Sequence, residues 1–388
     1  MNRKWTFVLV IVGLVVTCGI VIGGAKGQSS GAAQTTAAAP GEQPKEKKAE
    51  EQFKNIRVLK GIPADQLIPS MQFISASLGV ECEFCHVRGA FEKDDKKPKQ
   101  TARQMMEMMF AINADNFDRE RKVTCYSCHR GSTEPVGMPP VMTEEPKEGM
   151  SEPEKTEEKK ASAEPTGDQL LDKYVQAAGG AAAIEKITSR VMKGTIDFAG
   201  MSLPIDIYAK DPEKRISFTH TRDGDSVTAF NGHEGWLGMP GGQVREMRGN
   251  DLDGAAIDAD LHLATHLKQM FSEIQVRGTE KVGDHETYLV VGRREGKPPI
   301  RLYFDEQTGL LVRLMRFGET ALGRLPTQID YADYRDTDGV KIPYRWTLAR
   351  PNGRFTIQLS EVKQNIPVDD GKFTKPAAPP EPPKQPGE

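Results

Sequence analysis

The sequence lacks a strong charge of either sign, because its 388 residues include 52 basic and 55 acidic side chains and carry a formal net charge of -3. No basic patch with interleaved aromatic residues is present, so the chain shows no pattern typical of nucleic-acid binding, and we expect no nucleic-acid partner. It also lacks a P-loop, a dinucleotide-binding glycine fingerprint and a nucleophile elbow. These absences leave it without the usual motifs of nucleotide-dependent enzymes and of α/β-hydrolases.

Cysteine is scarce, with five residues, and four of them form two motifs of the type C-x-x-C-H. The motifs are CEFCH at 82–86 and CYSCH at 125–129, the attachment signature of covalent c-type haem. Two thiols must reach the two vinyl groups on one porphyrin edge while the adjacent histidine coordinates the iron. We therefore expect two covalently bound haem c groups, the attaching residues being Cys82, Cys85, Cys125 and Cys128. Neither alternative, a four-cysteine zinc site or a redox dithiol, explains why a histidine directly follows both cysteine pairs.

The ligand on the far side of each iron decides between electron transfer and catalysis. Of the seven histidines, only His86 and His129 lie near the motifs, and the other five come later in the chain: His220, His233, His262, His266 and His285. Ligation by two histidines is therefore not available in this segment, and methionine is the remaining common ligand. With both positions filled, neither iron has a site for substrate, so we expect an electron-transfer protein and not an enzyme.

Two segments place methionine on a helical pattern. In residues 64–79 the apolar side chains, Met71 among them, share one helical face, and Gly79 is expected to end that helix directly before the first motif. Pro69 marks a late start or a kink there.

The second segment is a predicted helix over 101–113 with Thr101 as its cap. Its candidate ligands are Met105, Met106, Met108 and Met109. Packing is the alternative role of each methionine, and helical geometry alone does not choose among the four.

Residues 53–137 resemble the tetrahaem cytochrome c subunit of photosynthetic reaction centres. The shared segments are 58–61, 102–108 with 111–113, and 123–131. The resemblance implies an all-α dihaem cytochrome in which the helix before each motif supplies a methionine, Met71 for the first haem and Met105 for the second. It also implies that the two haems lie close together around a local two-fold axis.

The resemblance covers half of that subunit, because two motifs are present instead of four. The histidine that ligates a distant haem in the family has no counterpart between Asn113 and Lys122. The resemblance implies a redox partner protein or membrane complex, which in the family is the photo-oxidised donor of the reaction centre. The alternatives are a dihaem peroxidase-like enzyme, and a lipid or lipoprotein carrier whose haem segment acts as a sensor or docking module.

The start of the chain bears on location, because covalent haem c is assembled outside the cytoplasm. Arg3 and Lys4 precede an apolar run that extends to Ala25 and is long enough to cross a bilayer. We expect residues 1–25 to be an inner-membrane signal anchor with the rest of the chain in the periplasm. Cleavage at the end of the run and lipidation of Cys18 are the alternatives, and all three export the protein.

Composition divides the remainder of the chain into five segments. They are a flexible linker (26–51), a dihaem cytochrome domain (52–140), a charged, disordered linker (141–167), an antiparallel half-barrel domain (168–375) and a proline-rich tail (376–388).

The half-barrel domain begins with two short helical patterns and continues with alternating segments separated by turns at 305–309 and 336–339. Helical periodicity returns at about 255–271. This pattern favours an α+β fold with one large antiparallel sheet curved over a few helices. The expected strands are 191–198, 203–209, 287–292, 300–304, 310–317, 328–334, 344–348 and 355–362.

This layout resembles the carrier fold of bacterial lipoprotein-sorting proteins of the LolA type, an incomplete β-barrel with a helical lid. The similar segments are 303–312 and 330–344. The resemblance implies a concave face that binds an acyl chain or lipoprotein, or a packed face that serves as a scaffold or docking surface. His262 and His266 lie four residues apart, but Leu263 stands where H-E-x-x-H requires glutamate, so we interpret them as ordinary helix positions.

Overall fold

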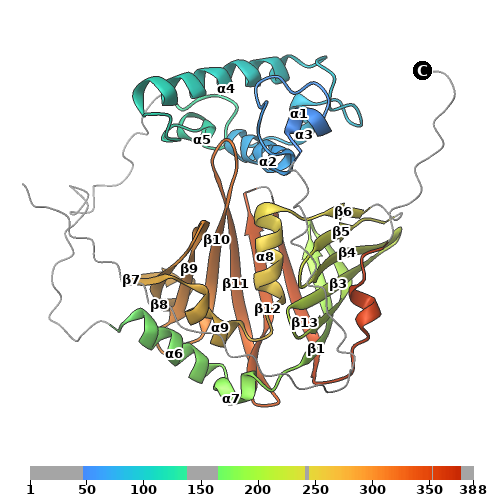
Figure 1. Ribbon diagram of the computed structural model, residues 1–388, viewed down its shortest axis with the longest axis vertical. Helices are drawn as coiled ribbons and strands as arrows, with labels where there is room; N and C mark the ends of the chain where they lie inside the picture. Colours follow the sequence, from blue (N-terminus) through green and yellow to red (C-terminus); the bar gives the residue numbers. More distant parts are fainter. Residues whose placement is uncertain (1–46, 138–164, 241–243, 352, 377–388) are drawn as a thin grey trace, which may run out of the picture. The chain divides into compact units, whose positions relative to one another are not determined.

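The computed structural model describes residues 47–137, 165–240, 244–351 and 353–376 (Figure 1). The anchor expected at 1–25 lies outside these ranges. Among the helices described, none is both long enough and apolar enough to cross a membrane. All of the described residues belong to one compact unit, residues 46–388.

The segment that carries both C-x-x-C-H motifs is helical. Glycine at position 79 ends α2 as expected, in the left-handed conformation with φ 67°. Pro69 falls in the first turn of α2, where a missing backbone donor costs little, so it marks a late start. The elements are α1 (Ala49–Gln52), η1 (Ala64–Gln66), α2 (Leu67–Leu78), α3 (Cys82–Cys85), α4 (Lys97–Asn116) and α5 (Cys125–His129).

Helix α4 is longer at both ends than the sequence pattern predicted. Its first turn contains Pro98, a residue favoured there because its ring already has a helical φ. The prediction that Thr101 caps the helix is wrong, since its hydroxyl donates to the carbonyl oxygen of Lys97 at 3.3 Å from within the helix.

The C-terminal part forms one sheet of thirteen strands within the described residues, and every neighbouring pair is antiparallel. Strands β1 to β6 and β7 to β13 each follow chain order, and the pairing of β1 with β13 joins the two sets. Strands β6 and β7 are the two edges, so the sheet is open. The strands are β1 (Ser189–Phe198), β2 (Met201–Lys210), β3 (Lys214–Thr221), β4 (Gly224–Asn231), β5 (Gly235–Gly238), β6 (Val244–Glu246), β7 (Glu273–Val282), β8 (His285–Arg294), β9 (Lys297–Asp305), β10 (Leu311–Glu319), β11 (Arg324–Thr337), β12 (Val340–Arg350) and β13 (Gly353–Gln364).

The large antiparallel sheet predicted from the sequence is confirmed, and all eight expected strands are present as β1, β2 and β8 to β13. Strands β3 to β7 were not expected. The helical pattern at 255–271 corresponds to two helices, α8 (Gly249–Ala259) and α9 (Leu263–Met270).

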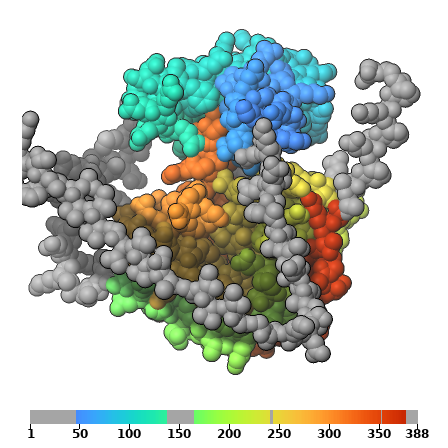
Figure 2. Space-filling model, viewed as in Figure 1, coloured from blue at the N-terminus to red at the C-terminus, as the bar shows by residue number. Residues whose placement is uncertain are grey.

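The helices α6 (Gly167–Ala177), α7 (Ala181–Ile184), α8 and α9 cover part of the sheet. Figure 1 shows α8 in front of the central strands and the other three grouped near one end of them. Leu171 of α6 and Leu267 of α9 are fully buried with Ile300 and Leu302 of β9, and this apolar contact holds the helices on the sheet. At the C-terminus, Phe373 of η2 (Asp370–Phe373) packs beside β3 and β4, where Figure 2 shows the segment in red.

The hairpin between β10 and β11 contributes to the core of the helical segment. Leu322 is fully buried in one apolar cluster with Phe73, Met106 and Met109. Arg121 forms an ion pair of 2.8 Å with Glu319 of the same hairpin. The helical segment with the two motifs and the tip of this hairpin of the sheet therefore share one hydrophobic core.

Candidate haem-binding site

Each motif histidine uses one ring nitrogen in the same way. The Nδ1 atom of His86 donates to the carbonyl oxygen of Phe91 at 2.9 Å, and Nδ1 of His129 donates to the carbonyl oxygen of Ser132 at 2.9 Å. Since a carbonyl oxygen only accepts hydrogen bonds, Nε2 of each neutral ring keeps its lone pair. A hydrogen bond of this kind orients a histidine that binds a metal. Both motifs therefore present an equivalent Nε2 ligand.

Each motif forms a short helix, α3 or α5, and this places its two thiols on one side of a helical turn. In the second motif the backbone N–H of Thr124 donates to Ser127 Oγ at 3.0 Å, which supports the start of α5. Because two residues separate the cysteines of each motif, the helical turn brings their two thiols to the same side. This is the arrangement that attachment to one porphyrin edge requires.

The four methionines of α4 divide into two pairs. Met106 and Met109 are buried, with exposed fractions of 6% and 5%, and pack in the core of the helical segment. Met105 and Met108 are exposed at 38% and 49%. Packing therefore accounts for Met106 and Met109, and leaves Met105 and Met108 as free thioethers.

A cavity of about 300 Å³ brings α4 and the second motif together. Its walls are mostly apolar and include all four methionines of α4 together with Cys125, Cys128 and His129. An apolar cavity lined by one imidazole, three thiols and four thioethers contains the donor set of a haem c with histidine and methionine ligands. The residues present therefore fit the group that the motif implies.

The first motif is placed differently. The cavity reaches Cys85 but not Cys82, His86 or Met71. Met71 is half-buried on α2 and packs against the core of the helical segment. The structure thus brings the methionines of α4, of which Met105 and Met108 are exposed, to the second motif, and it does not bring Met71 and His86 into this cavity.

The two helix and motif pairs are interlocked. Helix α2, which precedes the first motif, contacts α5 of the second, and α4, which precedes the second motif, contacts α3 of the first. The backbone N–H of Gly131 donates to the carbonyl oxygen of Ser77 at 2.8 Å, so the loop after the second motif lies against the end of α2. The two motifs consequently belong to one folded body.

Asn113 is a structural residue of the site, and no pattern in the sequence marks it for this role. Its buried amide donates to the carbonyl oxygens of Met109 at 3.1 Å and Val123 at 2.7 Å. Its Oδ1 accepts from the N–H groups of Lys122 and Val123 at 3.1 and 2.9 Å. This amide attaches the segment that leads into the second motif to α4.

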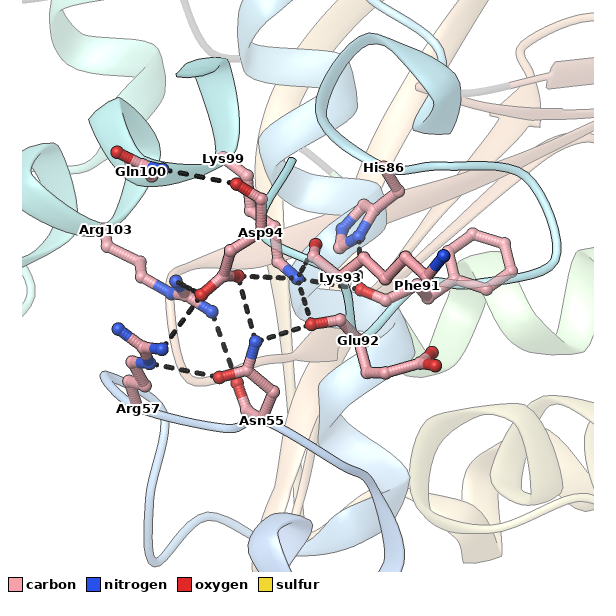
Figure 3. A network of polar contacts seen from close by, with 10 residues as sticks. All are labelled: Asn55, Arg57, His86, Phe91, Glu92, Lys93, Asp94, Lys99, Gln100 and Arg103. Atoms are coloured by element: carbon pink, nitrogen blue, oxygen red, sulfur yellow. Dashed lines mark hydrogen bonds and ion pairs between the residues drawn. The ribbon is translucent and has the colours of Figure 1, made fainter. Parts of the chain in front are cut away.

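A network of polar contacts lies next to the first motif, and sequence reasoning missed it (Figure 3). Lys99 is 8% exposed, and its ammonium donates to the carbonyl oxygens of Phe91, Glu92 and Lys93 at 2.8, 3.0 and 2.7 Å. The Phe91 carbonyl therefore accepts from both Lys99 and His86. The loop of residues 91–93 folds around a buried lysine, which no local sequence signal reveals.

The carboxylate of Asp94 joins this loop to cations from elsewhere in the segment. It lies 2.9 Å from Arg57, 3.1 Å from Lys99 and 2.9 Å from Arg103, and Asn55 donates to it at 2.9 Å (Figure 3). The hydrogen bonds from Arg103 and Lys99 hold the pKa of Asp94 well below its usual range, although partial desolvation opposes them. Three cations around one carboxylate leave the network with a net positive charge.

The alternatives to haem fit the geometry less well. Burial raises the pKa of the Cys85 and Cys125 thiols, whereas a redox dithiol needs a lowered thiol pKa. In the part of the chain that the structure describes, the four motif cysteines do not converge into a group that could hold one metal ion. A shared four-cysteine zinc site is therefore not formed.

Comparison with known proteins confirms the first resemblance stated above. Residues 24–174 match the family model of the photosynthetic reaction centre cytochrome C subunit. The chain is 35% identical over 92 residues to the photosynthetic reaction center cytochrome c subunit of Thermochromatium tepidum, which covers 23% of each chain. It is 32% identical over 85 residues to cytochrome c-554 of Chloroflexus aurantiacus, covering 20% of each. The chain thus spans less than a quarter of the length of both relatives.

The second resemblance, to lipoprotein-sorting proteins, is found among solved structures. A putative outer membrane lipoprotein-sorting protein domain from Vibrio parahaemolyticus matches 54% of this chain and 97% of its own, with a TM-score of 0.40 and 9% identity. A LolA superfamily protein from Nitrosomonas europaea matches 54% and 98%, with a TM-score of 0.38 and 14% identity.

We predict that Gly79→Ala destabilises the helical segment more than an ordinary glycine substitution. A Cβ at this position would lie 2.3 Å from the carbonyl oxygen of Gly131, in addition to the strain of the left-handed φ. The free energy of unfolding should fall by about 2 kcal/mol or more, measured by chemical denaturation.

Gly61→Ala is the matched control, because Gly61 has φ 82° but nothing within 4 Å of its Cβ position. It should cost only about 1 kcal/mol, the backbone strain alone. Equal losses for the two variants would contradict the close contact between α2 and the second motif.

Proposed function

We propose that the chain is a dihaem c-type electron-transfer protein, with one haem attached to Cys82 and Cys85 and the other to Cys125 and Cys128. The observation that carries the proposal is the pair of matching hydrogen bonds that leave Nε2 of His86 and His129 free for iron. The match to the reaction-centre cytochrome family supports it independently. Bound haem supplies a one-electron iron couple.

Met71 and Met105 are the proposed ligands opposite these histidines. The exposure of Met105 and its place in the cavity beside His129 support the second assignment. The resemblance to the reaction-centre subunit supports the first. A thioether opposite an imidazole favours ferrous iron and leaves no open position for a substrate, so the chain acts as a carrier of single electrons and not as a peroxidase.

The proposal extends to location and partner. The basic residues Arg3 and Lys4 ahead of the apolar run support an anchor at 1–25 in the inner membrane, with the haem-bearing residues in the periplasm. The family match supports a membrane complex as the redox partner, specifically a photosynthetic reaction centre whose photo-oxidised donor the chain reduces.

We predict that Met105→Leu opens the iron at the second motif, because leucine has no ligand atom. The wild-type ferric protein should be wholly low-spin and show the near-infrared sulfur-to-iron band for two haems. The variant should lose half of that band, bind carbon monoxide at one haem and lower one midpoint potential, as absorption spectroscopy and redox titration would show.

Met106→Leu is the matched control, because Met106 is buried in the core and leucine nearly conserves its volume. It should leave the spectrum and both potentials unchanged. A high-spin wild-type spectrum would overturn the carrier proposal in favour of an enzyme with an open iron. An unchanged Met105→Leu titration would reassign the ligand to Met108, the other exposed thioether of α4.

We predict that Lys99→Met lowers the potential of the haem at the first motif and not at the second. The variant removes a buried positive charge and also frees the Phe91 carbonyl to accept a stronger bond from His86. As a general scale, one charge about 10 Å from a redox centre at an effective dielectric of about 20 shifts its potential by roughly 70 mV, and we expect a shift of that order. Redox titration measures the shift.

Lys93→Met is the control, since it removes the same charge from the same loop at an exposed position. Solvent screening should reduce its effect to a small fraction of that of Lys99→Met. Equal shifts in both variants would show that the buried contact with the Phe91 carbonyl has no influence on the iron.

A second candidate function, binding of an anionic acyl chain, is favoured by a cavity of about 450 Å³ on the sheet. Its apolar lining includes Phe198, Trp346 and Phe355. Arg215 also lines it, and burial lowers the pKa of this guanidinium, against the opposing charge of Asp258. The lining also holds four further arginines and two carboxylates, namely Arg245, Arg316, Arg350, Arg354, Asp251 and Asp258. The cavity therefore combines apolar walls with an excess of cations, which suits a fatty acid carboxylate.

We predict that the full chain retains a fluorescent fatty acid and that Arg215→Gln weakens the binding by about tenfold, because a hydrogen bond to a charged group is lost. Arg222→Gln, in an exposed turn, is the control and should bind like the wild type. No retention by the wild type, or equal affinity in all three proteins, would leave the sheet as a scaffold.

A further inference from the structure

Two histidines at the start of α9 and a glutamate at the end of α7 lie close together, and none of them belongs to the haem-binding site. Glu185 follows the last residue of α7, His262 precedes α9 and His266 lies in its first turn. One ligand atom from each residue lies within 4.8 Å of the others. We propose that Glu185, His262 and His266 form a binding site for a divalent transition metal ion, of which zinc is the best match.

The buried histidine, His262, is oriented for this role. It is 7% exposed, and its Nε2 donates to the carbonyl oxygen of Ile187 at 2.8 Å. Because a carbonyl can only accept, Nδ1 of the neutral ring carries a lone pair. That lone pair faces two carboxylates, Glu185 at 4.0 Å and Asp211 at 3.7 Å.

These distances are informative because they are too long for hydrogen bonds. A lone pair that faces two negatively charged groups in a mostly buried position is unfavourable unless a positive charge lies between them. A zinc ion about 2.0 to 2.1 Å from each ligand separates two tetrahedral ligand atoms by about 3.4 Å. The observed separations therefore leave room for such an ion after side-chain movements of about 1 Å.

The second histidine has its own supporting carboxylate. Nδ1 of His266 donates to Asp260, at 2.9 Å from Oδ2 and 3.1 Å from Oδ1, so its Nε2 is free. The Asp260 side chain is only 7% exposed, and its Oδ1 also accepts from the backbone N–H of His262 at 2.8 Å. A carboxylate behind a histidine is the usual support of a zinc-binding imidazole.

A hydrogen bond also holds Glu185 in place and leaves one of its carboxylate oxygens available for the ion. The hydroxyl of Thr265 donates to Oε1 of Glu185, which leaves Oε2 toward His262. Glu185 is exposed and His266 is partly exposed, so an ion can enter from solvent and keep water as a further ligand. Two imidazoles, one carboxylate and an open position form a donor set that zinc accepts and that magnesium and calcium, which prefer oxygen, do not.

This assignment replaces the interpretation of His262 and His266 as ordinary helix positions. The sequence offered only their spacing of four residues, and the missing glutamate after His262 argued against a metalloprotease motif. The third ligand comes from α7, far earlier in the chain, and only the packing of α7 on α9 brings it near. A bound ion would tie these two helices together.

The test uses the full chain with every free thiol alkylated, because cysteine would otherwise compete for zinc. Isothermal titration with zinc chloride should show one equivalent bound, and the melting temperature should rise with zinc concentration. His266→Ala and Glu185→Gln should each weaken zinc binding by about tenfold or more and abolish the rise. Both residues are solvent-accessible, so these variants keep the fold.

His285→Gln is the matched control, since His285 also pairs with a carboxylate, Asp305 at 2.8 Å, on the same sheet but outside the three-residue group. It should bind zinc like the wild type. X-ray absorption spectroscopy at the zinc edge should show two imidazole nitrogen ligands and oxygen ligands. Absence of stoichiometric binding, or equal binding by the wild type and the His266 and Glu185 variants, would overturn the proposal.

Discussion

The bond from each motif histidine to a backbone carbonyl is the interaction on which the helical segment depends. A histidine that follows a two-cysteine turn binds a metal through Nε2 only when Nδ1 is satisfied elsewhere. The accepting carbonyls, at Phe91 and Ser132, lie in loops and must themselves be held in place. Lys99 holds the first loop through three carbonyls, and the end of α2 lies against the second. The buried Lys99 and the contact between the end of α2 and the second motif are explained by the need to hold these two carbonyls in place.

The sequence predicted which residues would attach and ligate haem, but it did not predict the residues that hold those groups in place. The cysteines and histidines were identifiable because a covalent attachment demands a local spacing, and the spacing is visible in one short motif. Met105 was selected from four candidates by family resemblance, and burial narrows the four to Met105 and Met108, since Met106 and Met109 pack in the core. Lys99 and Asp94 were not predicted, because their partners come from distant positions and a lysine-rich loop ordinarily indicates solvent exposure.

Strands were likewise predicted where the sequence signal is local and missed where the arrangement depends on neighbouring strands. Strands β8 to β13 were predicted because apolar and polar residues alternate along most of them between turn residues. Strand β9 departs from this, since its last four residues are all buried. The irregular feature of β3 and β4 is a polar face, with Arg215, Ser217 and Thr228, that lines the cavity on the sheet. Ile216 and Phe218 of β3 still alternate with polar residues, and this strand was not recognised. Strand β7 was missed where its pairing with β8 shifts between Val276 and Thr279. Neither irregularity can be seen without the neighbouring strands.

The open sheet has a further consequence for how copies of the chain behave toward one another. An unpaired edge can recruit the edge of a second molecule and start aggregation. Strand β6 has only three residues, and β7 is irregular at Gly278 and carries the charged residues Arg277, Glu280 and Lys281. Short length, irregular pairing and charge each make an edge a poor template. The sheet can therefore stay unclosed without offering a neighbouring copy a good edge to pair with.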